Sequence, residues 1–253
     1  MSRMYEALNK AQRDQNGRAR APIVTSSVNG RRHAPNIQWD FDGFARQEYE
    51  RIGILMKTPS HGKVLRTIAV VGCRSGSGAT TTATLMATTL ASSKRSRVLL
   101  VDANLRTPSL DLVFATPNTA GLTDVLVDDK PADACIQATG QDNLFVLTTG
   151  GIPAHPATVF ERAAIERFLE RTSTSFDFVI FDAAPVLQFP ATCALASHVD
   201  GVLLVLHADH TSVDDAKQAR LELERVNARV IGAVLNRRED YTPSLLRRFA
   251  ARA

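Results

Sequence analysis

The sequence is poor in the residues that would place it in several protein classes. Its 253 residues include only three cysteines, Cys73, Cys135 and Cys193, which are scattered and odd in number. This pattern argues against a disulfide framework or a cysteine metal site and suits a reducing cytosol. No apolar run reaches the roughly 18 residues that a membrane-spanning helix needs, and no signal-peptide core follows the polar start. We therefore expect a cytoplasmic globular protein.

Aromatic residues are also few, at 6% of the chain, and they do not interleave with the basic residues. The net charge of +4 is mild, but arginines gather near both ends of the sequence. These are Arg13, Arg18, Arg20, Arg31 and Arg32, then Arg237, Arg238, Arg247, Arg248 and Arg252. Basic arms can bind nucleic acid or anionic headgroups. Without aromatic stacking partners, nucleic acid is not an expected ligand, and a solvated tail is the simpler interpretation.

Composition divides the chain into zones. Residues 1–15 have the period of a short amphipathic helix. Residues 16–43 are rich in Gly, Pro, Ser, Asn and Arg, the composition of a flexible basic linker. Residues 44–240 form the predicted globular domain, which opens with a helical stretch at Phe44–Met56, and residues 241–253 form a basic tail.

Within the globular zone, short apolar runs alternate with helical periods. The runs, expected to be strands buried on both faces, are Thr67–Val71, Val98–Val101, Leu144–Leu147, Phe178–Phe181, Val202–Leu206 and Val230–Leu235. The helical stretches between them are Thr80–Ser93, Thr158–Thr172 and Val213–Val226. This alternation predicts an α/β fold with a mostly parallel sheet and helices on both faces. Ligands of such sheets bind beyond the carboxyl ends of the strands.

A glycine-rich segment, Gly72–Thr81, joins the first predicted strand to the first helix of the alternation. Such a turn directs backbone N–H groups and the positive end of a helix toward one place, which suits a phosphate. In a working phosphate loop (P-loop), the residue before the Ser/Thr is a lysine that reaches the β- and γ-phosphates. Here that residue is Ala79, and Thr80 follows it. A glycine-rich strand-to-helix turn without a ligand is the plainer alternative.

The missing lysine has consequences that can be sized. A charge-assisted hydrogen bond contributes about 1.5–3 kcal/mol, and about 1.4 kcal/mol corresponds to tenfold in affinity. Replacing the lysine with Ala79 should therefore weaken ATP or ADP binding by about one to two decades. Removing a group that stabilises developing charge commonly costs about 10²–10³ in rate. Weak nucleotide binding is compatible with this loop, whereas fast phosphoryl transfer is not.

Polar residues follow several of the predicted strands. Asp102 and Asp182 each come directly after a buried run, where two carboxylates could orient Mg²⁺ in one crevice. Either one alone could equally be a helix-capping aspartate. Asn236 and Arg237 follow the last run and could present an amide and a guanidinium to a nucleotide base.

A series of motifs runs in order through the globular zone. They are Val98–Arg106 (VLLVDANLR), Pro108–Leu110, Gly121–Leu126 (GLTDVL), Gly150–Pro156, Asp177–Val186 (DFVIFDAAPV) and Leu235–Arg237. Together they resemble the cytoplasmic bacterial tyrosine kinases of polysaccharide export (CpsD/CapB type), relatives of the ParA/MinD-type deviant P-loop ATPases. The resemblance spans roughly Phe44 to Asn236 and implies a P-loop NTPase-type fold.

The resemblance assigns roles to individual positions. It implies that Gly76, Gly78, Thr80 and Thr81 are phosphate and Mg²⁺ positions, that Asp102 and Asp182 are the acidic residues of catalysis and metal binding, and that Asn236 contacts the base. The sequence departs from the family pattern at Ala79, at Asn104 in place of a second acidic residue, and at the blurred oligomerisation motif Gln47–Gly53. The C-terminal tyrosine cluster is absent, since Tyr241 stands alone there.

Arg74 occupies the place of the signature lysine that deviant P-loop ATPases carry early in the loop. It could supply the missing cation, although a guanidinium is bulkier than an ammonium and differently shaped. A solvated loop arginine is the alternative.

Three functions are compatible with this pattern. The first is a degenerate kinase-like protein that regulates or scaffolds exopolysaccharide synthesis or export. It would be peripheral at the inner membrane, bound to the cytoplasmic tail of a membrane polysaccharide co-polymerase or to further copies of itself. The second is an active tyrosine autokinase or ATPase that uses Arg74. The third is a ParA/MinD-like positioning ATPase, which the kinase-type motifs disfavour.

Overall fold

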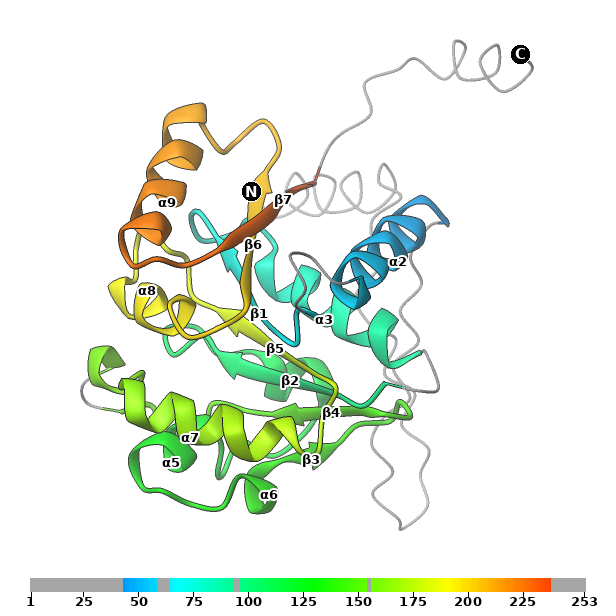
Figure 1. Cartoon of the computed structure of the whole chain (residues 1–253), viewed down its shortest axis with the longest axis vertical. Helices are drawn as coiled ribbons and strands as arrows, with labels where there is room; N and C mark the ends of the chain where they lie inside the picture. The colour runs from blue at the N-terminus through cyan, green and yellow to red at the C-terminus, as the bar shows by residue number, and fades with distance from the viewer. Residues whose placement is uncertain (1–42, 59–63, 93–95, 154–155, 238–253) are drawn as a thin grey trace, which may run out of the picture.

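A computed structural model describes residues 43–58, 64–92, 96–153 and 156–237. The predicted helix at 1–15, nearly all of the predicted linker and the predicted tail at 241–253 lie outside the described residues. The described chain forms a seven-stranded sheet of order β3-β4-β2-β5-β1-β6-β7, with helices packed on it (Figure 1). The predicted α/β fold class is confirmed.

Each predicted strand is present, with one further strand at an edge. The strands are β1 (Thr67–Gly72), β2 (Val98–Ala103), β3 (Gln137–Ala138), β4 (Leu144–Leu147), β5 (Phe178–Ala183), β6 (Gly201–His207) and β7 (Val230–Asn236). All neighbouring pairs are parallel except β3 with β4, which is antiparallel. Strands β2 and β5 run two residues further than expected, so Asp102 and Asp182 lie inside the sheet rather than after it.

The helices agree with the prediction where they are long. They are α2 (Gly43–Lys57), α3 (Ala79–Ala91), α4 (Leu110–Phe114), α5 (Leu122–Val127), α6 (Ala132–Cys135), α7 (Arg162–Ser173), α8 (Pro190–Ala196) and α9 (Val213–Arg225), with a 3₁₀ turn at Pro156–Thr158. The start predicted for α7 at Thr158 was wrong, because the 3₁₀ turn precedes the helix. The short helices were not predicted, since one or two turns carry too little periodicity.

The sheet separates two hydrophobic cores. Alternate residues of each central strand face opposite sides, as the two-residue period of a strand requires. On β1, Ile68 and Val70 join the core beneath α2, α3 and α4, while Ala69 and Val71 join the core beneath α5 to α9. Figure 1 shows α2 and α3 on one side of the sheet and α7, α8 and α9 on the other. The predicted helices on both faces are confirmed.

Strand β7 departs from the expectation that every strand is buried on both faces. It lies at the edge of the sheet, and Ala233 and Leu235 are exposed while the other residues of the strand are half-buried. Its apolar sequence resembles that of a central strand, but only the strand order decides which strand has a neighbour on one side alone.

The three cysteines are free thiols; Cys73 and Cys135 are buried and Cys193 is half-buried. Burial raises the pKa of the Cys73 thiol to about 11, so it is protonated at neutral pH. Among the described residues, no helix combines the length and apolar character that crossing a bilayer requires.

Candidate phosphate-binding site

The glycine-rich segment forms a tight turn between β1 and α3, at the carboxyl edge of the sheet. Gly76 and Gly78 adopt left-handed backbone angles, with φ of 82° and 87°. Gly78 is the N-cap of α3, so no N-cap side chain accepts a hydrogen bond from the N–H groups of the first turn. Free N–H groups at a helix N-terminus form a phosphate-binding surface. The loop therefore keeps the backbone features of a phosphate cradle.

Ala79 is the first residue of α3 and packs against the hydrophobic core beneath α2 and α3. Its methyl group carries no charge, at the position where a working phosphate loop has a lysine. Arg74 is the only basic residue in the sequence from Thr67 to Ser92. The first turn of α3 thus offers backbone dipoles to an anion without a side-chain cation.

Asn236 lies against the loop from the end of β7. Its side-chain Nδ2 donates a hydrogen bond to the carbonyl oxygen of Ser77 at 2.9 Å. A Cβ atom built on Gly78 would lie 2.1 Å from the same Nδ2 and would displace the Asn236 amide, and the left-handed φ of 87° at this position also favours glycine. The amide predicted to contact a base is therefore engaged in bracing the loop, and the neighbouring Arg237 is exposed with a left-handed backbone.

Asp102 is fully buried and its carboxylate is occupied by the backbone that follows β2. It accepts hydrogen bonds from the N–H groups of Asn104 at 3.2 Å and of Ser109 and Leu110 at 2.9 Å each. Burial raises the pKa of Asp102, and these N–H donors oppose the rise. The Asn104 side chain bonds in turn to Thr107. Both residues therefore shape the turn that leads into α4.

Asp182 lies directly opposite Asp102 in the register of β2 and β5. It is fully buried, and neither carboxylate oxygen makes a hydrogen bond of normal geometry. Burial and the charge of Asp102 raise the pKa of Asp182 well above its usual value, and the nearby Thr80 hydroxyl opposes this rise. A buried carboxylate without a partner is costly, which is the condition that a bound cation relieves.

Some of the oxygen atoms near Asp182 could hold a divalent cation, and others are already occupied. Asp182 offers two unpartnered oxygens, and the Thr80 hydroxyl lies close to it. Oxygen ligands of this type suit Mg²⁺. Asp102 has fewer lone pairs free because its oxygens already accept three hydrogen bonds. Thr81, the next residue of α3, is exposed.

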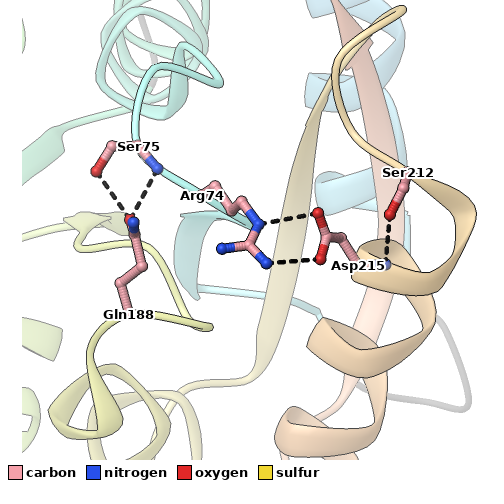
Figure 2. A network of polar contacts seen from close by, with 5 residues as sticks. All are labelled: Arg74, Ser75, Gln188, Ser212 and Asp215. Atoms are coloured by element: carbon pink, nitrogen blue, oxygen red, sulfur yellow. Dashed lines mark hydrogen bonds and ion pairs between the residues drawn. The ribbon is translucent and has the colours of Figure 1, made fainter.

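Two side chains that sequence reasoning did not predict hold the start of the loop. Asp215 on α9 receives two hydrogen bonds from Arg74, and the Gln188 side chain receives two from the N–H and hydroxyl of Ser75, both at 2.9 Å. Figure 2 shows these neighbouring loop residues reaching in different directions, Arg74 toward α9 and Ser75 toward Gln188. The Ser-x-x-Asp spacing at 212–215 predicts a helix cap, but no sequence signal pairs it with Arg74.

Known proteins with similar sequences and folds place this chain in a family. A family model described as an AAA domain matches residues 65–234. Tyrosine-protein kinase YwqD of Bacillus subtilis (strain 168) is 30% identical over 190 residues, covering 75% of this chain and 80% of the relative. The chain belongs to the CpsD/CapB-type family of P-loop ATPases.

Other members of the CpsD/CapB-type family agree in sequence and in structure. Tyrosine-protein kinase CpsD of Streptococcus agalactiae is 28% identical over 177 residues, which is 70% of this chain and 77% of CpsD. The crystal structure of the chimerical protein CapA2B2 has a TM-score of 0.70 at 25% identity and covers 77% of this chain and 85% of that one. The kinase domain of Escherichia coli tyrosine kinase ETK has a TM-score of 0.67 at 25% identity, with 71% of each chain covered. The resemblance stated from the motifs is confirmed.

Proposed function

We propose that this chain is a degenerate tyrosine-kinase-like P-loop protein that regulates or scaffolds exopolysaccharide synthesis and export, and that it is a weak or inactive phosphotransferase. The observation that carries the proposal is Ala79, whose methyl group packs on the hydrophobic core at the position of the loop lysine. The relatives named above are tyrosine-protein kinases, so the fold descends from a catalytic family while one of its charge-stabilising groups is missing.

Nucleotide binding is retained in weakened form under this proposal. The N–H groups around Gly76 and Gly78 would hold phosphate, and Thr80 and Asp182 would hold Mg²⁺, with Asp102 behind them. A bound Mg²⁺ would supply charge neutralisation on the phosphates. Asp102 and Asp182 would then support at most residual catalysis, because no lysine of this loop reaches the transferred group.

The loop cation does not offset this loss in the described conformation. Arg74 pairs with Asp215 on α9, which commits its guanidinium to a carboxylate outside the loop. This contact favours a degenerate protein that binds nucleotide weakly over an active autokinase in which Arg74 replaces the loop lysine. A ParA/MinD-like positioning ATPase remains the third candidate, and it predicts nucleotide-gated dimers and strongly salt-dependent DNA binding.

Calorimetric titration with ATP and ADP, paired with an ATP turnover assay, tests the proposal. Wild-type protein should bind about one to two decades more weakly than Ala79→Lys, since the variant regains a charge-assisted contact. Wild-type turnover should stay near background. Rapid phosphotyrosine formation by the wild type, lost in Arg74→Ala, would instead establish the autokinase.

For a partner, we propose the cytoplasmic tail of a membrane polysaccharide co-polymerase, which would make the chain a peripheral cytoplasmic protein at the inner membrane. A short amphipathic helix such as the one predicted at 1–15 is marginal alone and needs a partner surface. Deleting residues 1–36 should abolish capture of the protein by immobilised tail peptide while the melting temperature stays unchanged. Undiminished capture by the deleted protein would contradict this assignment.

A further inference from the structure

The pairing of Arg74 with Asp215 joins the phosphate loop to α9, a helix 141 residues further along the chain. The guanidinium donates from Nε at 2.9 Å and from Nη2 at 2.8 Å, one bond to each carboxylate oxygen. Two parallel bonds of this kind fix the direction of the guanidinium as well as its distance. The side chain of Arg74 is therefore aimed at α9.

Both ends of this contact are anchored independently of it. The backbone on the N-terminal side of Arg74 is held by Cys73, whose N–H donates to Val205 at 3.4 Å and whose carbonyl accepts from Leu187 at 3.3 Å. On α9, the Ser212 hydroxyl accepts a hydrogen bond from the N–H of Asp215 at 3.0 Å and caps the helix (Figure 2). The guanidinium can therefore change partners by side-chain rotation, without movement of the strand or the helix.

The strength of the contact suits reversible pairing. The Arg74 side chain is 58% exposed and the Asp215 side chain 23% exposed. Exposed ion pairs contribute little to stability, so a polyphosphate bound a few residues away can compete with a single carboxylate for the guanidinium. Asp215 thus opposes the transfer of Arg74 to a phosphate without preventing it.

We propose that Asp215 is a positioning residue that holds Arg74 away from the nucleotide phosphates and so lowers the nucleotide affinity of this loop. The inference deepens the proposed function: Ala79 removes one cation from the site, and Asp215 withholds the other. Helix α9 thereby determines whether the Arg74 guanidinium is available to the nucleotide phosphates. Any partner that displaces Asp215 from Arg74 would strengthen nucleotide binding.

The test is an ADP titration followed by the NMR shifts of the Gly76 and Gly78 amides, which detect millimolar affinities. Asp215→Asn keeps the shape of the side chain and removes its charge. We expect the affinity of this variant for ADP to rise about two- to fivefold, the range that an exposed ion pair allows. Arg74→Ala should abolish the gain, so that the double variant binds like Arg74→Ala alone.

Asp214→Asn is the matched control, because it removes the same charge from the neighbouring, exposed position in the first turn of α9. It should change the affinity less than Asp215→Asn does. Equal gains in these two variants would reduce the effect to net charge, and an unchanged or weaker affinity in Asp215→Asn would overturn the inference. The inference would also be overturned if Asp215→Asn still raised the ADP affinity in the absence of Arg74. It would be overturned as well if ADP binding remained undetectable in every variant.

The test of Asp215 and the test of the proposed function can fail independently of each other. Fast ATP turnover by the wild type would contradict the weak-enzyme proposal whatever the ratio between Asp215→Asn and wild type. A missing affinity gain in Asp215→Asn with slow wild-type turnover would contradict only the role of Asp215.

Discussion

Two aspartates that face each other across β2 and β5 have opposite surroundings. Asp102 satisfies three backbone N–H groups, whereas Asp182 is buried beside it with neither oxygen hydrogen-bonded. Hydrogen bonds to a buried carboxylate stabilise the fold, while a buried charge without partners destabilises it. The same residue type thus caps a turn at one position and is a buried carboxylate without a hydrogen-bond partner at the other, where we propose that it binds Mg²⁺.

Substitution with asparagine should separate these two roles. At pH 7, Asp182→Asn should raise the free energy of unfolding by about 1–3 kcal/mol, and Asp102→Asn should lower it by a similar amount. The pKa of Asp182 is raised on folding, so its ionisation destabilises the fold as pH rises above its usual value of 3.8. The advantage of Asp182→Asn should therefore disappear below that pH. Urea unfolding at several pH values measures both effects, and a destabilised Asp182→Asn protein at pH 7 would contradict the assignment.

At the scale of elements, α5 is fitted closely against the end of β4. The N–H groups of Leu122 and Thr123 donate to the carbonyls of Thr148 at 2.8 Å and of Thr149 at 3.0 Å. A Cβ atom on Gly121 would lie 2.1 Å from the Thr148 oxygen and 2.4 Å from the Gly150 nitrogen. The GLTDVL motif therefore begins with glycine because two backbone segments touch there.

Gly121→Ala should consequently lower the stability of the fold, since backbone atoms cannot move aside as a flexible side chain can. Overpacking of this kind typically costs about 1–3 kcal/mol and sometimes more. Gly151→Ala is the control, because a Cβ there meets no atom within 4 Å. Chemical denaturation of both variants measures the difference, and equal stabilities would show that α5 can shift away from β4 without cost.

For the whole molecule, α2 forms part of the globular domain. Tyr49 and Met56 belong to the core shared with α3. A Cβ atom built on Gly53 would lie 3.4 Å from Cδ2 of Leu90, so the two helices approach each other closely at this glycine. The opposite side of α2 exposes Ile54 and Leu55. The helical stretch predicted ahead of the first strand is thus an integral layer of the fold.

Adjacent residues of α2 provide a test of this docking. Met56 is 1% exposed and Leu55 is 67% exposed. Met56→Ala should cost about 2–5 kcal/mol because it leaves a cavity in the core that α2 shares with α3, whereas Leu55→Ala should change stability by less than about 0.5 kcal/mol. Thermal unfolding of both variants distinguishes them, and a harmless Met56→Ala would indicate that the domain is stable without α2.

Local patterns in the sequence were sufficient for much of this molecule. Continuous apolar runs identified the long strands, and the order of β-strand and α-helix predicted a parallel sheet with helices on both faces. The motifs from Val98 to Arg237 identified the family, and the glycine spacing located the phosphate loop with its missing lysine. These features depend on neighbours within a few residues or on motif order, which the chain carries without being folded.

Only the tertiary structure decided which groups the site residues contact. The sheet order placed β7 at an edge and set Asp102 opposite Asp182. Packing then directed the Asn236 amide to the loop and Arg74 to Asp215 on α9. Such contacts join residues that are 80 positions apart for Asp102 and Asp182 and 159 apart for Ser77 and Asn236. Their partners follow from how strands and helices are stacked, because a local pattern carries no information about which distant side chain will lie beside it.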